Sequence, residues 1–432
     1  MIDSRERINF DLPANPAEAI DNENKTFMII WSWGLRCNYD CSYCSPERHN
    51  ADSPHTEKDN LLKAVEFLRK YRNKMSNFID HKTWYISITG GEPTANPYFI
   101  DTIKDLRVKA PEFKLDVTTN GSFNNKIRDA INENFDHITI SYHAESDRRL
   151  KDKVLENIRY FHANGPKLKV NLMMHAYEYW DECVELAETF KEEGINFVPR
   201  IIGESMEKNR FNHQYSEEQK NWMKDFWKVK GNKNIKSVSK DIKVEKIKEE
   251  ETATAKVVRE ENKKRKPETA STLAKADLGR YCCGKTDMCS LGGDTKTWET
   301  TKLINHTKFK NWFCLINFYF LYIDQEADSV WHHQTCKANW DPKRDFFRDP
   351  NETGKDIQSP IGKISEYDKI LTDLDKRTEN GFIPMIQCPR GSCGCGVCVP
   401  KAKDAVIADS LFKKHIKNLE PAWQNSNKIE NK

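Results

Sequence analysis

The chain has 432 residues, of which 38% are hydrophobic and 31% carry a charge, and its 69 basic and 66 acidic residues leave a formal net charge of only +3. This balance excludes a strong overall field that would draw the protein onto nucleic acid or an anionic membrane. The sequence has no apolar run long enough to cross a bilayer, and its start, MIDSRERINFDLP, lacks the apolar core of a secretory signal. We therefore expect a cytoplasmic protein without a membrane partner, and nucleic-acid binding is not favoured.

Short β-rich runs alternate with longer amphipathic runs through the first half of the chain. Residues 57–75 and 146–165 repeat apolar side chains near helical spacing. Strict alternation of strand and helix predicts an α/β fold whose parallel strands are covered by crossover helices. The six predicted strands are FMIIWSW (27–33), WYISITG (84–90), KLDVTTNG (114–121), HITISYH (137–143), KVNLMMH (169–175) and FVPRII (197–202).

Unusual residues follow four of these strands. Three cysteines come after the first strand and GGEPT comes after the second. Asn120-Gly121 ends the third strand, and His143 ends the fourth. Parallel α/β sheets bind their ligands at the carboxyl ends of the strands. We therefore expect these four features to share one rim of the sheet.

The second half of the chain differs in composition. Residues 229–275 are low in aromatic residues and dense in both charge signs, which is typical of a charged linker or insertion. This segment divides the chain into residues 1–228, the linker 229–275, and a smaller cysteine-rich C-terminal domain at 276–432. Within that domain, FYFLYIDQEADSVWHHQTC (318–336) predicts two short strands joined by an acidic turn.

The sequence RCNYDCSYC places Cys37, Cys41 and Cys44 close together. In a reducing compartment, clustered cysteines indicate metal binding more readily than disulfides. Two cysteines would suggest a redox pair, and four would complete a zinc or iron-sulfur site, whereas three leave one metal position open. A cubane iron-sulfur cluster held by three thiolates has one iron that can accept a chelating amine and carboxylate, such as those of S-adenosylmethionine.

The spacing Cys37-x3-Cys41-x2-Cys44, with Tyr43 before the third cysteine, resembles the signature of the radical S-adenosylmethionine (radical SAM) superfamily. The resemblance covers roughly residues 25 to 205. It implies a partial (β/α)6 parallel barrel, a 4Fe-4S cluster with one open iron held by the three cysteines, and S-adenosylmethionine bound at that iron.

The same resemblance implies further residues around S-adenosylmethionine. Gly90, Gly91, Glu92 and Pro93 match the second motif of the family, which holds the methionine amino group. Tyr43 would approach the adenine. Asn120 and Ser141 would lie near the adenosine, and Arg200 would meet the carboxylate.

The later cysteines resemble the SPASM or twitch extension of many radical enzymes, which carries an auxiliary iron-sulfur cluster. The resemblance implies an auxiliary 4Fe-4S cluster whose ligands come from this set. Closely spaced cysteines also suit tetrahedral zinc, so a zinc site remains the alternative. Cys183, in the helical stretch WDECVELAETF, is expected in the core instead. The candidate ligands are Cys289, Cys336, Cys388, Cys393, Cys395 and Cys398.

The implied activity is reductive cleavage of S-adenosylmethionine to a 5'-deoxyadenosyl radical, which abstracts hydrogen from a substrate. A flavodoxin- or ferredoxin-type protein would supply the electron. The SPASM-like extension favours a peptide or protein side chain as the substrate, and a nucleotide, sugar or other small molecule is the alternative. A non-catalytic iron-sulfur or zinc-binding protein is the alternative of a different class. The sequence identifies no catalytic acid or base.

Overall fold

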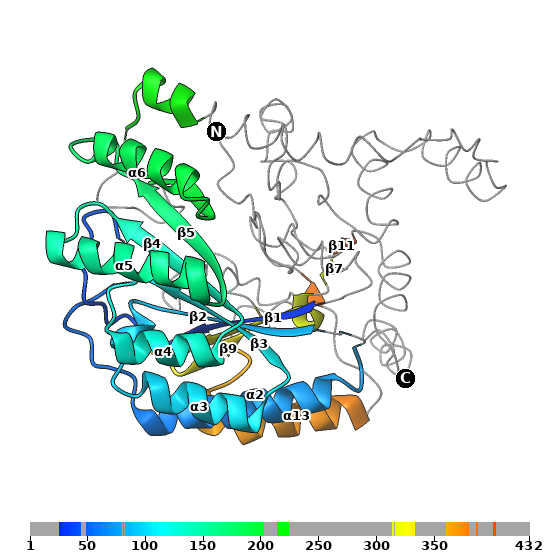
Figure 1. Cartoon of the computed structure of the whole chain (residues 1–432). Coiled ribbons are helices and arrows are strands. Elements are labelled where there is room, and N and C mark those ends of the chain that lie inside the picture. The colour runs from blue at the N-terminus through cyan, green and yellow to red at the C-terminus, as the bar shows by residue number, and fades with distance from the viewer. Residues whose placement is uncertain are drawn as a thin grey trace, which may run out of the picture.

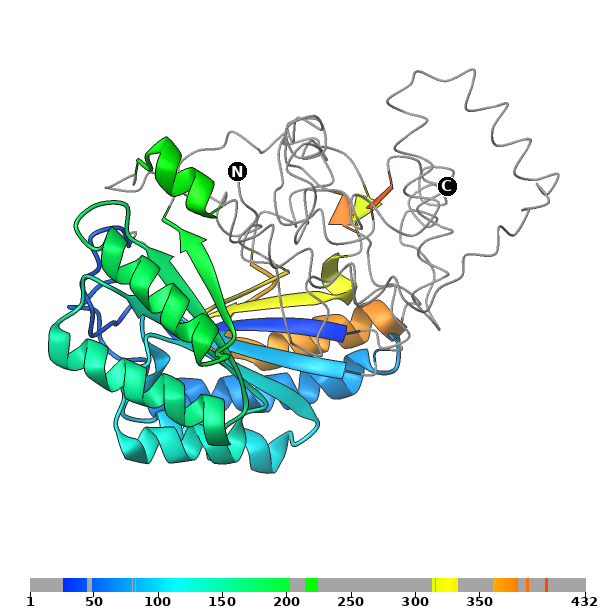
Figure 2. The ribbon, with the colours of Figure 1, turned by 45° about the horizontal axis from the view of Figure 1, so that its top comes forward.

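The computed structural model describes residues 26–44, 49–79, 81, 83–202, 214–223, 313–314, 316–332, 360–379, 386–387 and 401–402. Within these residues the main feature is one eight-stranded sheet, in the order β6-β5-β4-β3-β2-β1-β8-β9. Figure 1 shows its helices gathered on one face, and Figure 2 shows the same two layers from another side.

The first six strands are parallel and lie in chain order, which confirms the partial barrel predicted from the sequence. Their ends differ by one or two residues from most of the predicted bounds. The strands are β1 (Thr26–Ser32), β2 (Thr83–Thr89), β3 (Phe113–Thr119), β4 (His137–His143), β5 (Lys167–Met174) and β6 (Phe197–Ile201).

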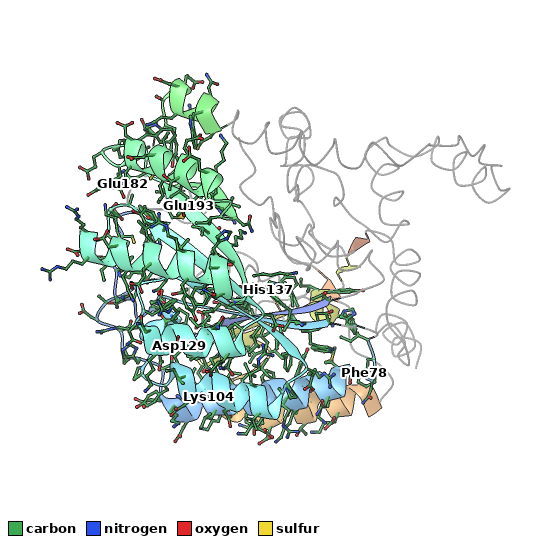
Figure 3. All side chains as sticks on the ribbon, viewed as in Figure 1. Phe78, Lys104, Asp129, His137, Glu182 and Glu193 are labelled. Carbon is green, nitrogen blue, oxygen red and sulfur yellow. The ribbon has the colours of Figure 1, made fainter. Side chains whose placement is uncertain are left out.

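Crossover helices cover the face of the sheet that we call the outer face. In α2, Leu61, Val65 and Leu68 recur at helical spacing and are fully buried, and each contributes roughly 1.5–3 kcal/mol by leaving water. Figure 3 shows labelled residues Lys104 and Asp129 on these helices. The helices are α2 (Lys58–Met75), α3 (Phe99–Lys109), α4 (Asn125–Asn134), α5 (Arg148–Asn164) and α6 (Trp180–Glu192).

The hairpin predicted within residues 318–336 is present as β8 (Phe320–Asp324) and β9 (Ser329–Trp331). Its position in the fold was not anticipated, because β8 pairs in parallel with β1 and so extends the barrel sheet. Helix α13 (Tyr367–Glu379) then packs beside α2, where Lys70 Nζ lies 3.3 Å from Asp368 Oδ1. Parts of the C-terminal half therefore complete the barrel domain.

A second, three-stranded sheet has the order β10-β7-β11. It consists of β10 (Ile386–Gln387), β7 (Phe313–Cys314) and β11 (Lys401–Ala402). The division at residues 228 and 275 remains a prediction, because residues 224–312 lie outside the described residues. In the described part of the chain, no helix combines the length and apolar character needed to cross a membrane.

Candidate functional site

The loop after β1 is fixed by backbone pairing with the loop after β2. Gly91 N donates to Gly34 O at 2.8 Å, and Glu92 N donates to Arg36 O at the same distance. The two segments thus continue side by side beyond the ends of their strands. This pairing carries the next residue, Cys37, onto the carboxyl rim of the sheet.

The glycine pair in the second motif is needed for this close approach. A Cβ at Gly91 would lie 2.3 Å from Arg36 O, which is far inside the contact distance of real atoms. Gly90 has a φ of +142°, a conformation that other residues rarely adopt. The sequence GG therefore serves the packing of the cysteine loop against the second strand.

The carboxylate of Glu92 is buried and receives four hydrogen bonds. Oε1 accepts from Thr94 N, from the Thr94 hydroxyl and from the Thr119 hydroxyl at 2.6–3.0 Å. Among the described residues, Oε2 accepts a hydrogen bond from Asn120 N alone, at 2.6 Å. Burial raises the pKa of Glu92, and these donors act against that rise. A carboxylate oxygen accepts about two bonds, so Oε2 keeps acceptor capacity for a ligand.

Three side chains close a ring of hydrogen bonds between the cysteine loop and the end of β3. Asn120 Nδ2 donates to Asn38 Oδ1 at 2.7 Å, and Asn38 Nδ2 donates to Ser122 Oγ at 2.9 Å. Ser122 Oγ in turn donates to Asn120 Oδ1 at 2.7 Å. The predicted site residue Asn120 is thereby tied directly to the residue after Cys37.

The three cysteines are half-buried in one short loop that turns on a bond from Cys44 N to Cys41 O at 2.9 Å. Burial raises the pKa of the Cys37 thiol to about 11, and the negative charges of Glu92 and Cys44 add to the rise. Burial likewise raises the pKa of Cys41, together with the charges of Glu145, Cys44 and Cys37. The three thiols therefore lie close enough for their ionised forms to repel one another, and bound iron would offset that repulsion.

A gathering of three thiols from one loop fits a cubane cluster, in which each thiolate binds a different iron. Among the described residues, no group of three or more His, Cys, Asp or Glu side chains is arranged to hold a single metal ion. The sulfur donor set itself is the type that iron-sulfur clusters require.

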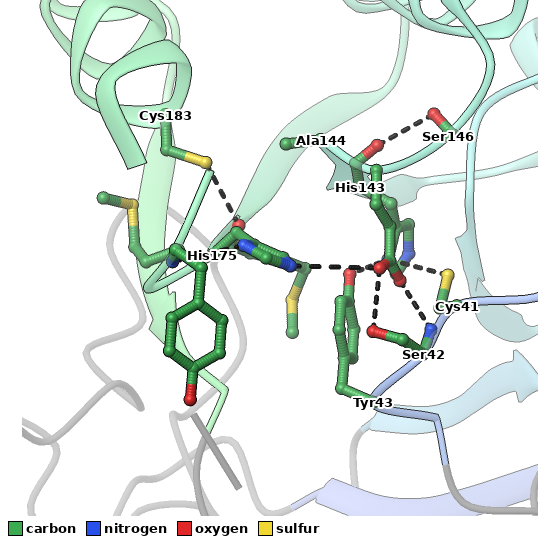
Figure 4. A network of polar contacts seen from close by, with 12 residues as sticks. Cys41, Ser42, Tyr43, His143, Ala144, Ser146, His175 and Cys183 are labelled. Carbon is green, nitrogen blue, oxygen red and sulfur yellow. Dashed lines mark hydrogen bonds and ion pairs between the residues drawn. The ribbon is translucent and has the colours of Figure 1, made fainter. Parts of the chain in front are cut away.

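His143, at the end of β4, contacts the cysteine loop through one ring nitrogen. Its Nδ1 lies 2.6 Å from the Tyr43 hydroxyl and 3.4 Å from Cys41 Sγ. Burial lowers the pKa of His143 to about 4 and raises that of Tyr43, so the ring is neutral and the hydroxyl protonated near pH 7. In the tautomer that carries its proton on Nε2, Nδ1 accepts a hydrogen bond from the Tyr43 hydroxyl. The Tyr43 ring also stacks on the imidazole (Figure 4).

Glu145, two residues after His143, also holds the cysteine loop. Its two carboxylate oxygens accept bonds from Ser42 N at 2.7 Å and from Ser42 Oγ at 2.8 Å. His175 Nε2 lies 3.9 Å from Oε2 of the same carboxylate. Figure 4 shows this network beside Cys183, which is fully buried and bonds to the Met173 carbonyl, as expected for a core residue.

Ser141 and Arg200 lie on the face of the sheet opposite the helices, which we call the inner face. Ser141 is paired in register with Asn171 on β5. Arg200 Nε donates to Asn171 Oδ1 at 3.0 Å. Both predicted residues therefore neighbour Asn171, whose side chain is a neutral amide. Their roles toward S-adenosylmethionine remain predictions.

Sequence reasoning noted His143 but did not include it among the site residues, and it missed Asn38, Asn171, Glu145 and His175. The His143-x-Glu145 pattern directly after a strand was the one available signal. The predicted auxiliary ligands Cys289, Cys336, Cys388, Cys393, Cys395 and Cys398 all lie outside the described residues.

Residues 31–190 match the family model described as the Radical SAM superfamily. GTP 3',8-cyclase of Clostridium perfringens (strain 13 / Type A) is 29% identical over 171 residues, which cover 37% of this chain and 50% of that protein. The S-adenosylmethionine-dependent nucleotide dehydratase of Fibrobacter sp. (strain UWH6) is 26% identical over 177 residues, covering 37% and 51%.

Among solved structures, Streptococcus suis SuiB bound to S-adenosylmethionine aligns with a TM-score of 0.36 and 15% identity, covering 48% of each chain. This chain spans about half the length of the GTP 3',8-cyclase and the nucleotide dehydratase that it matches.

The family match begins within β1 and ends within α6, so it includes the cysteine loop, the Gly-Gly-Glu-Pro turn and the Asn120 loop. These are the three segments that the hydrogen bonds join on the rim. Residues 31–190 of this chain therefore form a radical SAM domain.

Proposed function

We propose that this chain is a radical SAM enzyme whose substrate is a nucleotide. The observation that carries the chemistry is the joining of three cysteines, Glu92 and Asn120 on one rim within the matched segment. The relatives support the substrate class, because one is named for GTP and another for nucleotides. A nucleotide therefore takes precedence over the peptide side chain that the sequence had ranked first.

Each residue of the rim has a part in this proposal. Cys37, Cys41 and Cys44 would bind three irons of a 4Fe-4S cluster. Glu92 Oε2 would accept a hydrogen bond from the methionine ammonium, and Asn120 would position the adenosine. When bound, the cluster would supply the one electron that splits S-adenosylmethionine into methionine and a 5'-deoxyadenosyl radical.

The protein's main task is then placement. A hydrogen atom moves from a substrate carbon to the 5' carbon, which needs close approach and not proton transfer. Tyr43 would approach the adenine, Ser141 would lie near the adenosine and Arg200 would meet the carboxylate of S-adenosylmethionine. A flavodoxin- or ferredoxin-type protein is the proposed electron donor.

An auxiliary 4Fe-4S cluster held by the later cysteines is part of the proposal. A variant in which Cys37, Cys41 and Cys44 are all alanine, purified without oxygen, should retain about four irons if that cluster exists. If this variant instead contains stoichiometric zinc and no iron, the proposed auxiliary cluster is wrong and the later cysteines bind zinc.

The substrate class is tested with the full chain, reconstituted anaerobically with iron and sulfide. Dithionite, S-adenosylmethionine and one of GTP, ATP, CTP or UTP are added, and 5'-deoxyadenosine is measured by mass spectrometry. One nucleotide should raise its formation well above the level without substrate. Stimulation by peptides and by none of the nucleotides would overturn the nucleotide assignment.

A further inference from the structure

Four polar side chains lie on adjacent strands of the inner face of the barrel sheet, and we call them the inner polar row: Ser87, Asp116, Thr139 and Lys169. They belong to β2, β3, β4 and β5, and the register pairs Ser87 with Asp116 and Thr139 with Lys169. The register partner of Asp116 on β4 is His137, two residues before Thr139. Because side chains alternate along a strand, these four point away from the helices. The neighbours that face the helices are Ile86, Ile88, Leu115, Val117, Ile138, Ile140, Leu168 and Val170.

Asp116 has acceptor capacity that the protein does not use. Its side chain is buried, with 7% exposed. Oδ2 accepts a hydrogen bond from Ser87 Oγ at 2.9 Å, whereas Oδ1 is buried and has no hydrogen-bond partner among the residues that the structure describes. Buried polar atoms are paired in most proteins, so this oxygen is able to accept a hydrogen bond from a ligand or a water molecule.

The charge of Asp116 and its distance below the rim of the sheet limit which ligands could bind it. Burial raises the pKa of Asp116 to about 6, while Ser87, Lys169 and Thr139 lower it, so the group is mostly ionised near pH 7. Asp116 lies three residues before Thr119, whose hydroxyl binds Glu92, which places it about 10 Å below the rim. A small substrate with its reacting carbon at the rim could therefore reach Asp116.

The chemistry of the inner polar row favours a nucleobase over a phosphate. A carboxylate only accepts hydrogen bonds and an ammonium only donates them. Phosphate would face the like charge of Asp116, whereas guanine is neutral and offers an N–H donor next to the O6 acceptor. We propose that Asp116 and Lys169 form the subsite for the guanine edge of the substrate, with the phosphates directed toward the rim. This inference rests on the proposed nucleotide function.

The test compares bases that differ at ring positions 2 and 6. GTP, inosine triphosphate, which lacks the 2-amino group, and ATP are titrated by calorimetry into the anaerobically reconstituted full chain with S-adenosylmethionine bound. Inosine triphosphate keeps the N–H donor next to O6, whereas ATP has neither group, so the unmodified protein should bind GTP and inosine triphosphate at least tenfold more tightly than ATP. Equal affinity for GTP and ATP would overturn the subsite without any variant being made.

Variants then locate the discrimination. D116N should lose at least tenfold in GTP affinity and reduce the preference for GTP over ATP. D105N, which removes a carboxylate from α3 on the outer face, is the matched control and should bind GTP as the unmodified protein does. Unchanged GTP affinity in D116N would overturn this inference and leave the proposed function standing. Failure of the unmodified protein to bind any nucleotide would overturn both.

Discussion

Both carboxylate oxygens of Glu145 bind Ser42, which stands 103 positions earlier in the chain and between two of the three loop cysteines. The loop after β4 therefore braces the cysteine loop after β1. Hydrogen bonds to a charged group contribute roughly 1.5–3 kcal/mol, so this pair is a substantial restraint on a short loop.

Replacing Glu145 with alanine should speed loss of iron from the cysteine loop, because Ser42 N and Oγ lose their acceptor. The measurement is the rate at which a chelator removes iron from the reconstituted protein under anaerobic conditions. Glu133→Ala, on the exposed side of α4, is the control and should match the unmodified protein. A rate in Glu145→Ala equal to that of the control would show that the brace is unimportant.

Gly91→Ala should destabilise the protein and release the loop. The added Cβ would meet Arg36 O at 2.3 Å, and overpacking of this kind costs about 1–3 kcal/mol. Urea denaturation and iron content measure the two effects. Gly194→Ala separates steric contact from backbone strain, because Gly194 has a φ of +71° but nothing within 4 Å of its Cβ position. Gly194→Ala should lose stability without losing iron, and an equal loss of iron in both variants would contradict the steric explanation.

Glu92→Gln should keep the loop cluster and weaken S-adenosylmethionine binding. Four donors converge on the carboxylate, so the amide NH2 of glutamine must face at least one of them. A tenfold or larger loss of affinity is expected, equivalent to about 1.4 kcal/mol. Calorimetry with S-adenosylmethionine and an iron assay on the same sample provide the check. Loss of iron in this variant would assign Glu92 a structural role instead.

Protonation of His137 should weaken the fold in mild acid. Burial lowers its pKa from 6.5 to about 4, with Asp136 raising it and Lys114 lowering it. Between these values the unfolded chain binds the proton and the folded protein does not, so stability falls as pH decreases through this window. The urea midpoint should drop less between pH 7 and pH 5 in His137→Gln than in the unmodified protein. Equal drops would contradict the assignment.

The local features of the site were predictable from the sequence, whereas its long-range contacts were not. Strand alternation and the positions of the cysteines and GGEP correctly placed the motifs on one rim, because parallel strands must end at the same edge. The pairing of β8 with β1 joins segments nearly 300 residues apart, and no periodicity encodes such a pairing. The oxygen of Asp116 that has no partner among the described residues was equally hidden, since one acidic residue in a strand of alternating apolar and polar residues does not reveal its partners.

The central claim is that this chain cleaves S-adenosylmethionine reductively at the cysteine loop and passes the radical to a nucleotide. The most direct measurement uses nucleotides deuterated at their non-exchangeable carbon positions with the reconstituted protein, dithionite and S-adenosylmethionine. The account predicts deuterium in the 5'-deoxyadenosine that forms, and no 5'-deoxyadenosine at all from Cys44→Ala. Two results would contradict the account. One is formation of 5'-deoxyadenosine by Cys44→Ala, and the other is 5'-deoxyadenosine that carries no deuterium with every deuterated nucleotide tested.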